Sequence, residues 1–390
     1  MSGGLLDGLR VLEFGHIAAA PFCGMLLADL GADVVKVEAP EGDGLRAWPP
    51  IVKNAAGQAF SLNFASLNRG KRSLVANLKD RAQLARVAAL CARVDVIIEN
   101  YRPGALDRLG LGFEEVAKRN ASIVYCSISG YGQTGERARK GAFDVVVQGA
   151  SGLMSVTGEP DRPPVKCGVP VADFTAGLYA AYTIVAAHPR AVRERRAIHL
   201  DCAMLDCLLG ISALQTSEYW GTGVAPARLG SAHPRNAPYQ AFDASDAQFI
   251  IAAGNDNLWR EVCEATGRLD LLDDPRFAGI AERAKHQAAL VDILQPVFRT
   301  KTSREWLDEF GRRGVPSGPV NTFADILGDP ALVASRLIQP MSVPVAQTTP
   351  TVAYPVQMNG ERVRAMRPPP ALGEHTDEVF AEWLAAPRAT

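Results

Sequence analysis

The first 130 residues alternate short runs of branched apolar residues with segments in which apolar positions recur at helical spacing. The runs predict β-strands at residues 10–14, 33–38, 95–99 and 122–127. The intervening segments predict helices at residues 21–30, 81–92 and 113–119. Such alternation is typical of βαβ units and predicts a parallel sheet with helices on both faces.

The remainder of the chain divides into two parts with different patterns of apolar and polar residues. Three longer apolar helices are predicted at residues 142–156, 174–188 and 200–220. Gly and Pro then punctuate residues 221–238, after which a strand at 248–253 is followed by helices at 257–266, 287–298 and 303–313. We therefore expect a large α/β domain that begins with residues 1–220, a smaller α+β domain at residues 221–322, and a Pro-rich return segment at residues 323–390.

The composition excludes several classes of protein. Of the 390 residues, 47% are hydrophobic and 21% are charged, which provides a large core and excludes wholesale disorder. The net charge is −1 and no run of about 18 apolar residues is present, so we expect neither a nucleic-acid nor a membrane partner. The seven cysteines form no CxxC pair, which predicts free thiols and no metal site. No signal-peptide pattern opens the chain, so we expect a cytoplasmic protein.

Polar residues follow the predicted strands, where an open parallel sheet binds its ligands. The residues after the first and third strands are His16, Ile17, Ala18, Asn100, Tyr101 and Arg102. The first turn reads GHIAAAP rather than GxGxxG, which argues against a nicotinamide or flavin site. Neighbouring loops carry further basic residues, among them Lys79, Arg108 and Lys140. These are either solvated surface or a site for a phosphorylated small molecule.

Asp173 precedes an apolar helix in the string GVPVADFTAG. One interpretation is a helix N-cap, and the other is a carboxylate nucleophile in a poorly hydrated site. A free Asp titrates near 3.9, so burial must raise its pKa by about 3 units before it is half protonated at pH 7. A helix N-terminus offsets up to about 2 kcal/mol of that effect, so we expect a partly buried Asp173 to stay anionic.

Long strings in a fixed order carry a resemblance to a known family. They read LLDGLRVLEFGHIAAAPFCGMLLADLGADVVKVEAPEGD, NRGKRSLVANLK, ENYRPGALDRLGLG, SISGYGQTG, GAFDVVVQGASGLMSVTGEPDRPPVKCGVPVADFTAGLYAA, RLGSAHPRNAPYQAF and ALGEHTDEV. From about residue 5 to about residue 380, the chain resembles the family III (CaiB/BaiF) coenzyme A transferases. The resemblance implies a Rossmann-like large domain built from both ends of the chain and an inserted small domain. It also implies a homodimer of interlocked rings, in which residues 323–390 complete the large domain and wrap the partner.

The resemblance implies roles for individual residues. Asp173 matches the catalytic aspartate, and acyl-CoA is a substrate rather than a permanently bound cofactor. Positions that match CoA contacts are His16, Ile17, Ala18, Ala76, Lys79, Asn100, Tyr101, Arg102, Arg108 and Lys140. Some members carry Arg at the position of Ala39, and Arg46 is a candidate substitute for that phosphate contact. Arg46 and His233 are also candidates for the acceptor carboxylate, and Gly254 for a glycine-loop lid.

The implied activity moves CoA from an acyl-CoA donor to a carboxylic acid, through a mixed anhydride and an aspartyl-CoA thioester on Asp173. The string GLMSVTGEPDRPPVKCGVPVADFTAGLYA resembles members that use succinyl-CoA and short dicarboxylates. Two alternatives stay open. The related 2-methylacyl-CoA racemases use a His-Asp pair where this chain has Phe143 and Asp144, and Phe cannot move a proton. A non-catalytic CoA-binding protein would retain the basic residues and lose the acid, whereas Asp173 is present.

Overall fold

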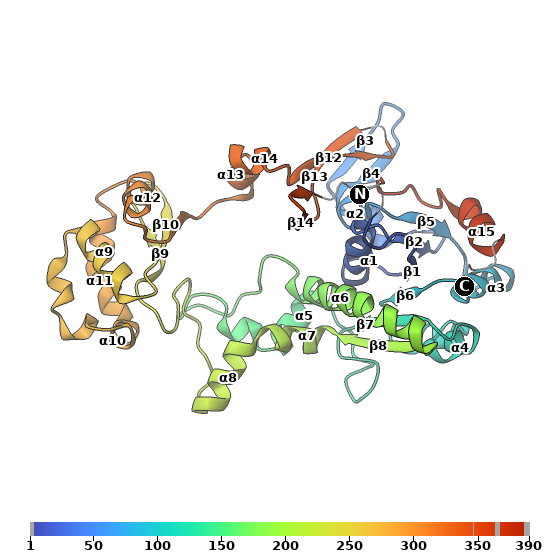
Figure 1. Cartoon of the computed structure of the whole chain (residues 1–390), viewed down its shortest axis with the longest axis horizontal. Helices are drawn as coiled ribbons and strands as arrows, with labels where there is room; N and C mark the ends of the chain where they lie inside the picture. Colours follow the sequence, from blue (N-terminus) through green and yellow to red (C-terminus); the bar gives the residue numbers. More distant parts are fainter. Residues whose placement is uncertain (1–3, 346, 363–366, 386–390) are drawn as a thin grey trace. The chain divides into compact units, whose positions relative to one another are not determined.

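The computed structural model describes residues 4–345, 347–362 and 367–385. The described residues form two compact units, drawn in Figure 1. Unit 1 contains the residues up to Leu153, residues 166–224 and those from Pro330 onward. Unit 2 contains residues 154–165 and 225–329.

Unit 1 is built on a six-stranded parallel sheet. Its strands are β1 (Arg10–Phe14), β2 (Asp33–Glu38), β5 (Arg72–Val75), β6 (Val96–Glu99), β7 (Val124–Ser129) and β8 (Ile198–Ala203). They lie in the order β5-β2-β1-β6-β7-β8, and every neighbouring pair is parallel. This is the doubly wound order of nucleotide-binding folds, in which the order reverses between β1 and β6. The Rossmann-like parallel sheet predicted from the sequence is confirmed.

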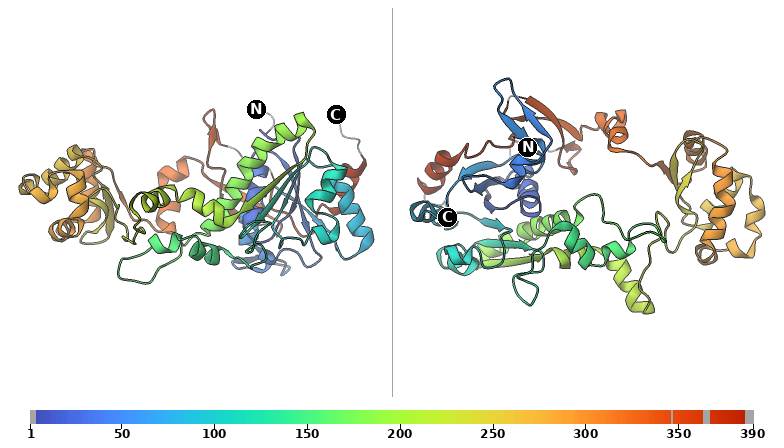
Figure 2. Two further views of the ribbon diagram at one scale, coloured as in Figure 1. Left: turned by 90° about the horizontal axis from the view of Figure 1, so that it is seen from below. Right: turned by 180° about the vertical axis from the view of Figure 1, so that it is seen from behind.

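Helices cover both faces of this sheet, as Figure 2 shows. On one face, α1 (Ala19–Asp29), α6 (Val171–Glu194) and α7 (Met204–Ile211) share a buried apolar cluster with the strands. On the other face, the cluster is completed by α3 (Arg81–Cys91), α4 (Phe113–Arg119) and α15 (Thr376–Ala385). The return segment therefore contributes to the core, since α15 buries Val379, Phe380 and Trp383.

Shorter elements complete unit 1. Near the N-terminus they are the antiparallel pair β3 (Ile51–Lys53) and β4 (Ala59–Ser61), followed by α2 (Leu62–Asn68). Farther along they are α5 (Asp144–Ala150), α8 (Ala213–Thr222), α14 (Pro330–Ala334), β12 (Ile338–Val343), β13 (Gln347–Val352), β14 (Gln357–Met358) and β15 (Glu361–Arg362). No helix formed by the described residues combines the length and hydropathy needed to span a bilayer.

Unit 2 packs helices against a small antiparallel sheet. The sheet has the order β11-β10-β9, with β9 (Tyr239–Asp243), β10 (Gln248–Ala252) and β11 (Ser317–Pro319). Its helices are α9 (Asp256–Thr266), α10 (Ile280–Lys285), α11 (Gln287–Phe298), α12 (Ser303–Arg312) and α13 (Phe323–Leu327). The core is aromatic, with Phe249, Phe298, Trp306 and Phe310 buried together.

The predicted secondary structure is wrong at four places. The single helix expected at residues 200–220 is instead the end of β8 followed by α7 and α8, and β5 was not predicted. The apolar run from residue 198 fits either period, and pairing of its backbone with β7 decides for a strand. In addition, the helix expected at 174–188 begins earlier, at Val171, and the one expected at 142–156 ends at Ala150.

Candidate active site

Two of the predicted ligand-binding loops meet where the strand order reverses. His16–Ala18 follow β1 and Asn100–Arg102 follow β6, and these two strands are neighbours. The backbone N–H of His16 donates to Asn100 Oδ1 at 2.9 Å, and Asn100 Nδ2 donates to the His16 carbonyl at 2.9 Å. The side chain of Asn100 thus fixes one loop to the other at the usual ligand crevice of such sheets.

His16 is also tied to Tyr101. Its Nε2 lies 2.8 Å from the Tyr101 hydroxyl, and the two rings meet edge to face with centroids 5.1 Å apart. Burial, and then the charge of Lys36, lower the pKa of His16. A neutral, oriented imidazole therefore occupies this position at neutral pH.

The remaining predicted CoA contacts lie on loops that leave the same sheet edge. The buried Ala76 follows β5, and its N–H donates to the Glu38 carbonyl at the end of β2. Lys79 lies three residues farther on and is exposed. These two residues flank the crevice on the side of β2 and β5.

The other basic residues lie beyond β6 and β7. Arg102, Arg108 and Lys140 are exposed. The Arg102 guanidinium reaches the loop that carries Lys140, since its Nη2 lies 3.9 Å from where a Cβ on Gly141 would stand. Three cations therefore leave this side of the sheet edge.

Asp173 lies in the first turn of α6, which begins at the carboxyl edge because it runs back between two parallel strands. One turn farther on, Gly177 packs so closely on α1 that a Cβ there would stand 2.8 Å from the Ala19 carbonyl oxygen. The rings of Phe174 and Phe22 are 4.5 Å apart. The start of α6 is thus packed on the start of α1, directly after the His16–Ala18 turn.

The N-cap interpretation of Asp173 is wrong, because Pro170 is the N-cap residue and Asp173 lies inside the helix. Burial, and then the negative charge of Asp144, raise the pKa of Asp173 to about 7. The helix N-terminus therefore offsets less of the burial effect than the sequence suggested. The ionised form of Asp173 is therefore poorly solvated.

The capping of α6 is supplied by a second acid, Asp144. Its Oδ1 accepts the Ala172 N–H at 2.8 Å, and its Oδ2 accepts from Gln148 Nε2 at 2.6 Å. Gln148 is fully buried and its Oε1 accepts the Cys167 N–H at 2.8 Å. Asp144 and Gln148 therefore hold the segment that leads to Asp173. Sequence analysis considered Asp144 only as half of a racemase pair, although its i, i+4 spacing with Gln148 on one helix was a usable signal.

Four charged side chains, whose buried pairing the sequence did not predict, form one network next to the turn that follows β1. Lys36 lies 3.0 Å from Glu13 and 2.9 Å from Asp43, and Lys71 lies 2.8 Å from Glu13. The side chains of all four are fully buried. A signal existed, because central strands of a parallel sheet are buried on both faces, so Glu13 and Lys36 had to be paired inside.

The three residues suggested for the acceptor or the lid do not belong to the loops that follow β1 and β6. Arg46 donates to both oxygens of Glu38 at 2.7 Å and to the Pro370 carbonyl at 3.1 Å, which commits its guanidinium to protein partners. His233, in unit 2, accepts the Arg235 N–H through Nδ1. Gly254 follows β10 in unit 2 and has open space at its Cβ position.

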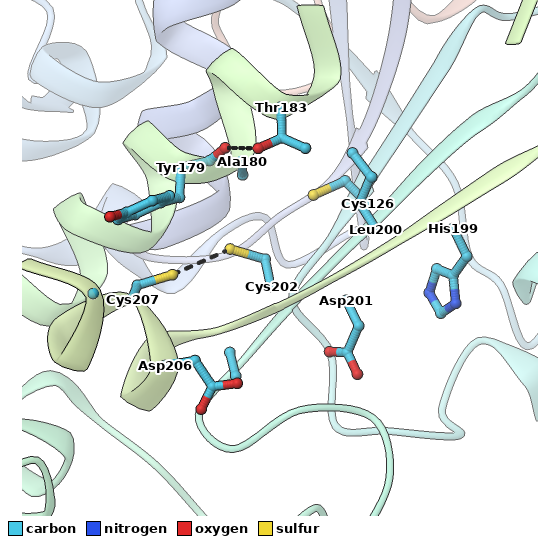
Figure 3. Close-up of a pocket in the computed structure, with 12 residues that line it drawn as sticks. Cys126, Tyr179, Ala180, Thr183, His199, Leu200, Asp201, Cys202, Asp206 and Cys207 are labelled. Carbon is cyan, nitrogen blue, oxygen red and sulfur yellow. Dashed lines mark hydrogen bonds between the residues drawn. The ribbon is translucent and has the colours of Figure 1, made fainter. Parts of the chain in front are cut away.

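A cavity of about 390 Å³ lies beside β8, between α6 and α7 (Figure 3). Tyr179 and Thr183 of α6 face Cys202 and Cys207 across it, and the two sulfurs are 3.6 Å apart. It is lined by none of the predicted site residues, so the crevice between β1 and β6 remains the candidate site.

All seven cysteines are free, as predicted. The described residues contain no group of His, Cys, Asp or Glu side chains that could hold a metal ion.

Comparisons with known proteins match CoA-transferases over nearly the whole chain. The family model described as CoA-transferase family III matches residues 6–376. The chain is 40% identical over 380 residues to the succinate–glutarate CoA-transferase of Agrobacterium fabrum, covering 97% of this chain and 95% of that protein. It is 37% identical over 387 residues to the succinyl-CoA:mesaconate CoA-transferase of Haloarcula marismortui, covering 97% and 96%.

The fold agrees as well. A crystal structure of a CAIB/BAIF family protein from Brucella suis matches with a TM-score of 0.88 at 38% sequence identity, covering 98% of this chain and 100% of that one. Since the family model and these relatives span nearly the full length, the chain belongs to CoA-transferase family III.

Proposed function

We propose that this protein is an acyl-CoA:carboxylate CoA-transferase that moves CoA from succinyl-CoA to a short dicarboxylic acid, with Asp173 as the acyl carrier. The observation that carries the proposal is a carboxyl in the first turn of α6, on a helix start that packs against the start of α1, where burial raises the pKa of Asp173 to about 7. A carboxylate that is poorly solvated is more nucleophilic than one in water. Membership of CoA-transferase family III supports the reaction class.

The proposed reaction uses Asp173 in successive acyl transfers. The Asp173 carboxylate attacks the donor thioester carbonyl, and a mixed anhydride forms as CoA leaves as a thiolate. The thiolate attacks the Asp173 carbonyl, which releases the donor acid and leaves an aspartyl-CoA thioester. The acceptor carboxylate attacks this thioester to form a second anhydride, and CoA then attacks the acceptor acyl group and regenerates Asp173. Water must be excluded because anhydrides hydrolyse.

In this proposal CoA lies along the sheet edge. His16, Ile17 and Ala18 contact its reactive end, with Asn100 and Tyr101 beside them. Ala76 and Lys79 contact the adenosine end, and Arg102, Arg108 and Lys140 bind phosphates. The hydrogen bonds between the loops after β1 and β6 support a shared site. The exposure of the three cations supports contact with a charged ligand. Because Arg46 is committed to Glu38, the proposal gives it no phosphate.

A dicarboxylate acceptor is supported by two of the relatives, a succinate–glutarate CoA-transferase and a succinyl-CoA:mesaconate CoA-transferase. We assign no acceptor contact to His233 and no lid role to Gly254. The proposed setting is the cytoplasm, where the seven thiols stay reduced.

The proposal includes an interlocked homodimer. Large apolar side chains are exposed along α6, α7 and α8, among them Leu178, Tyr182, Val192, Leu209, Leu214 and Trp220. Exposed apolar surface of this extent marks an interaction site, and a second copy of the chain would cover it. Light scattering coupled to size exclusion should give twice the chain mass of 41.7 kDa.

A donor–acceptor matrix read by mass spectrometry tests the function. Succinyl-CoA with glutarate, mesaconate or citramalate should yield the new thioester, and borohydride added during turnover should reduce the side chain at Asp173. Asp173→Asn should bind CoA and transfer none. Product formation with an unmodified Asp173 would refute the mechanism. Rapid deuterium uptake at the α-carbon of a 2-methylacyl-CoA, without transfer, would favour a racemase.

A further inference from the structure

The turn that follows β1 holds a β-branched residue in the left-handed region of backbone space. Ile17 has a φ of 63°. This conformation is rare for a β-branched residue, because Cβ crowds the following carbonyl. Such a residue persists only where the surrounding structure holds it there. Ile17 is the central residue of the turn that we propose contacts CoA, and neighbouring side chains keep its backbone in this conformation.

Asp43 holds Ile17 through the backbone. Both carboxylate oxygens of Asp43 lie 3.2 Å from the Ile17 N–H nitrogen. Asp43 is itself fixed, because Oδ1 accepts the Leu45 N–H at 2.9 Å and its own N–H donates to Glu38 at 3.1 Å. The Asp43 side chain is fully buried, so water does not compete for the Ile17 N–H.

Lys36 holds the other side of the same turn. Its ammonium donates to the Gly15 carbonyl, two residues before Ile17, and pairs with both Glu13 and Asp43. One cation therefore fixes the chain entering the turn and also the carboxylate that fixes its centre. Burial alone would lower the pKa of Lys36, but the carboxylates around it outweigh burial and raise it, so the ammonium persists at neutral pH.

Close packing alone would not require the buried charges of Lys36, Glu13 and Asp43. A buried ion pair seldom stabilises a fold more than apolar side chains of similar size would. Apolar residues at these positions could fill the space, but they could not bind the Gly15 carbonyl or the Ile17 N–H. The neighbouring helix also leaves room for the charges, since a Cβ on Gly24 would overlap the Glu13 carboxylate.

We propose that Asp43 and Lys36 are positioning residues, which hold Ile17 in its left-handed conformation and thereby fix the backbone of the His16–Ala18 turn that binds CoA. The identity of the ligand rests on the proposed function. Neither side chain is proposed to touch CoA, so their effect must pass through the backbone of the turn.

Asp43→Asn tests the proposal, because Asn keeps the shape and loses the charge that pairs with Lys36. We expect its affinity for CoA, measured by titration calorimetry on the full chain, to fall by about tenfold or more, since release of strain of this kind shifts an equilibrium by about that factor. The KM for acyl-CoA should rise, while that for the acceptor stays unchanged. If Asp43→Asn fails to fold, Lys36→Met/Asp43→Asn removes both charges together and should show the same loss.

Asp29→Asn is the matched control. Asp29 pairs with Arg69 at 2.7 Å, both side chains are at most 7% exposed, and Asp29 lies at the opposite end of α1. This variant should lose thermal stability and keep CoA affinity within about twofold, as expected for a distant site.

Rescue separates positioning from general damage. Glycine adopts the left-handed region without strain, so in an Ile17→Gly background the further change Asp43→Asn should weaken CoA binding by no more than about twofold. Hydrogen exchange gives a readout that does not depend on CoA: residues 15–18 should exchange faster in Asp43→Asn than in Asp29→Asn.

The outcomes are distinct. An Asp43→Asn protein with wild-type CoA affinity, or an equal loss in the Ile17→Gly background, would overturn the proposal. Failure of the wild-type protein to bind CoA would refute the proposed function instead. In that event, hydrogen exchange still tests the positioning role. Unchanged exchange of residues 15–18 in Asp43→Asn would overturn it as well, and faster exchange would support the conclusion that Asp43 fixes the turn.

Discussion

Replacing Asp173 by Asn is expected to stabilise the folded protein above neutral pH while it abolishes transfer. Burial, with a further contribution from Asp144, raises the pKa of Asp173 from 3.8 to about 7. A carboxyl whose pKa is higher in the folded than in the unfolded state favours folding only while it is protonated. The fold therefore loses stability as the pH rises from about 4 through about 7, and the whole cost is present above that range. Asn has nearly the same size and carries no charge.

The magnitude follows from the shift. A change of about 3 units corresponds to about 4 kcal/mol at 1.36 kcal/mol per unit. The side chain is only partly buried, so solvent screening reduces this, and about 1–2 kcal/mol is expected at alkaline pH. For a domain of this size that is a rise in Tm of a few degrees.

Calorimetric scans of wild type and Asp173→Asn at about pH 8.5 and about pH 5.5 measure the effect. The difference in Tm should be positive at the higher pH and should shrink at the lower one, where Asp173 in the wild type is protonated. Asp206→Asn is the control, because Asp206 also lies in the first turn of a helix, α7, and lines the separate cavity beside β8. An Asp173→Asn protein that is less stable at pH 8.5, or a difference that does not change with pH, would refute the reasoning.

Three further predictions follow from the same packing and charges. Asp144→Asn removes a negative charge beside Asp173 and should move the acid limb of the kcat/KM profile to lower pH, whereas an unmoved limb would show that the two carboxyls do not interact. Gly177→Ala places a Cβ 2.8 Å from the Ala19 oxygen and should displace the first turn of α6, with a loss of about 1–3 kcal/mol from overpacking and about tenfold in kcat; an unchanged kcat would argue against close packing at this point. Trp383→Ala should lower the unfolding free energy in urea by about 3–5 kcal/mol, and a loss below about 1 kcal/mol would mean that α15 is not part of the core.

The sequence predicted best those elements whose apolar residues follow a single spacing and whose ends are marked by turn residues. Residues 10–14 and 33–38 match β1 and β2 residue for residue, because buried parallel strands read as short branched apolar runs between turn residues. Helix α6 was located but not bounded, since its first turn holds an acid that local sequence reads as a cap. β8 was lost in an apolar stretch that suits a helix equally well, and only its partner β7 distinguishes the two.

The chain by itself determined the class of sheet and the loops that follow β1 and β6, because these depend on short-range periodicity and on residues that follow strands. The proposed role of the acid at position 173 came from the family resemblance. The tertiary structure alone decided the state of that acid. Its raised pKa depends on how closely α6 packs on α1 and on a carboxylate that arrives from α5. The conformation of Ile17 has the same origin, because its N–H donates directly to Asp43, which pairs with the buried Lys36, and charges brought together from distant segments carry no local signature. Burial and pairing are properties of the folded neighbourhood, so no reading of adjacent residues could supply them.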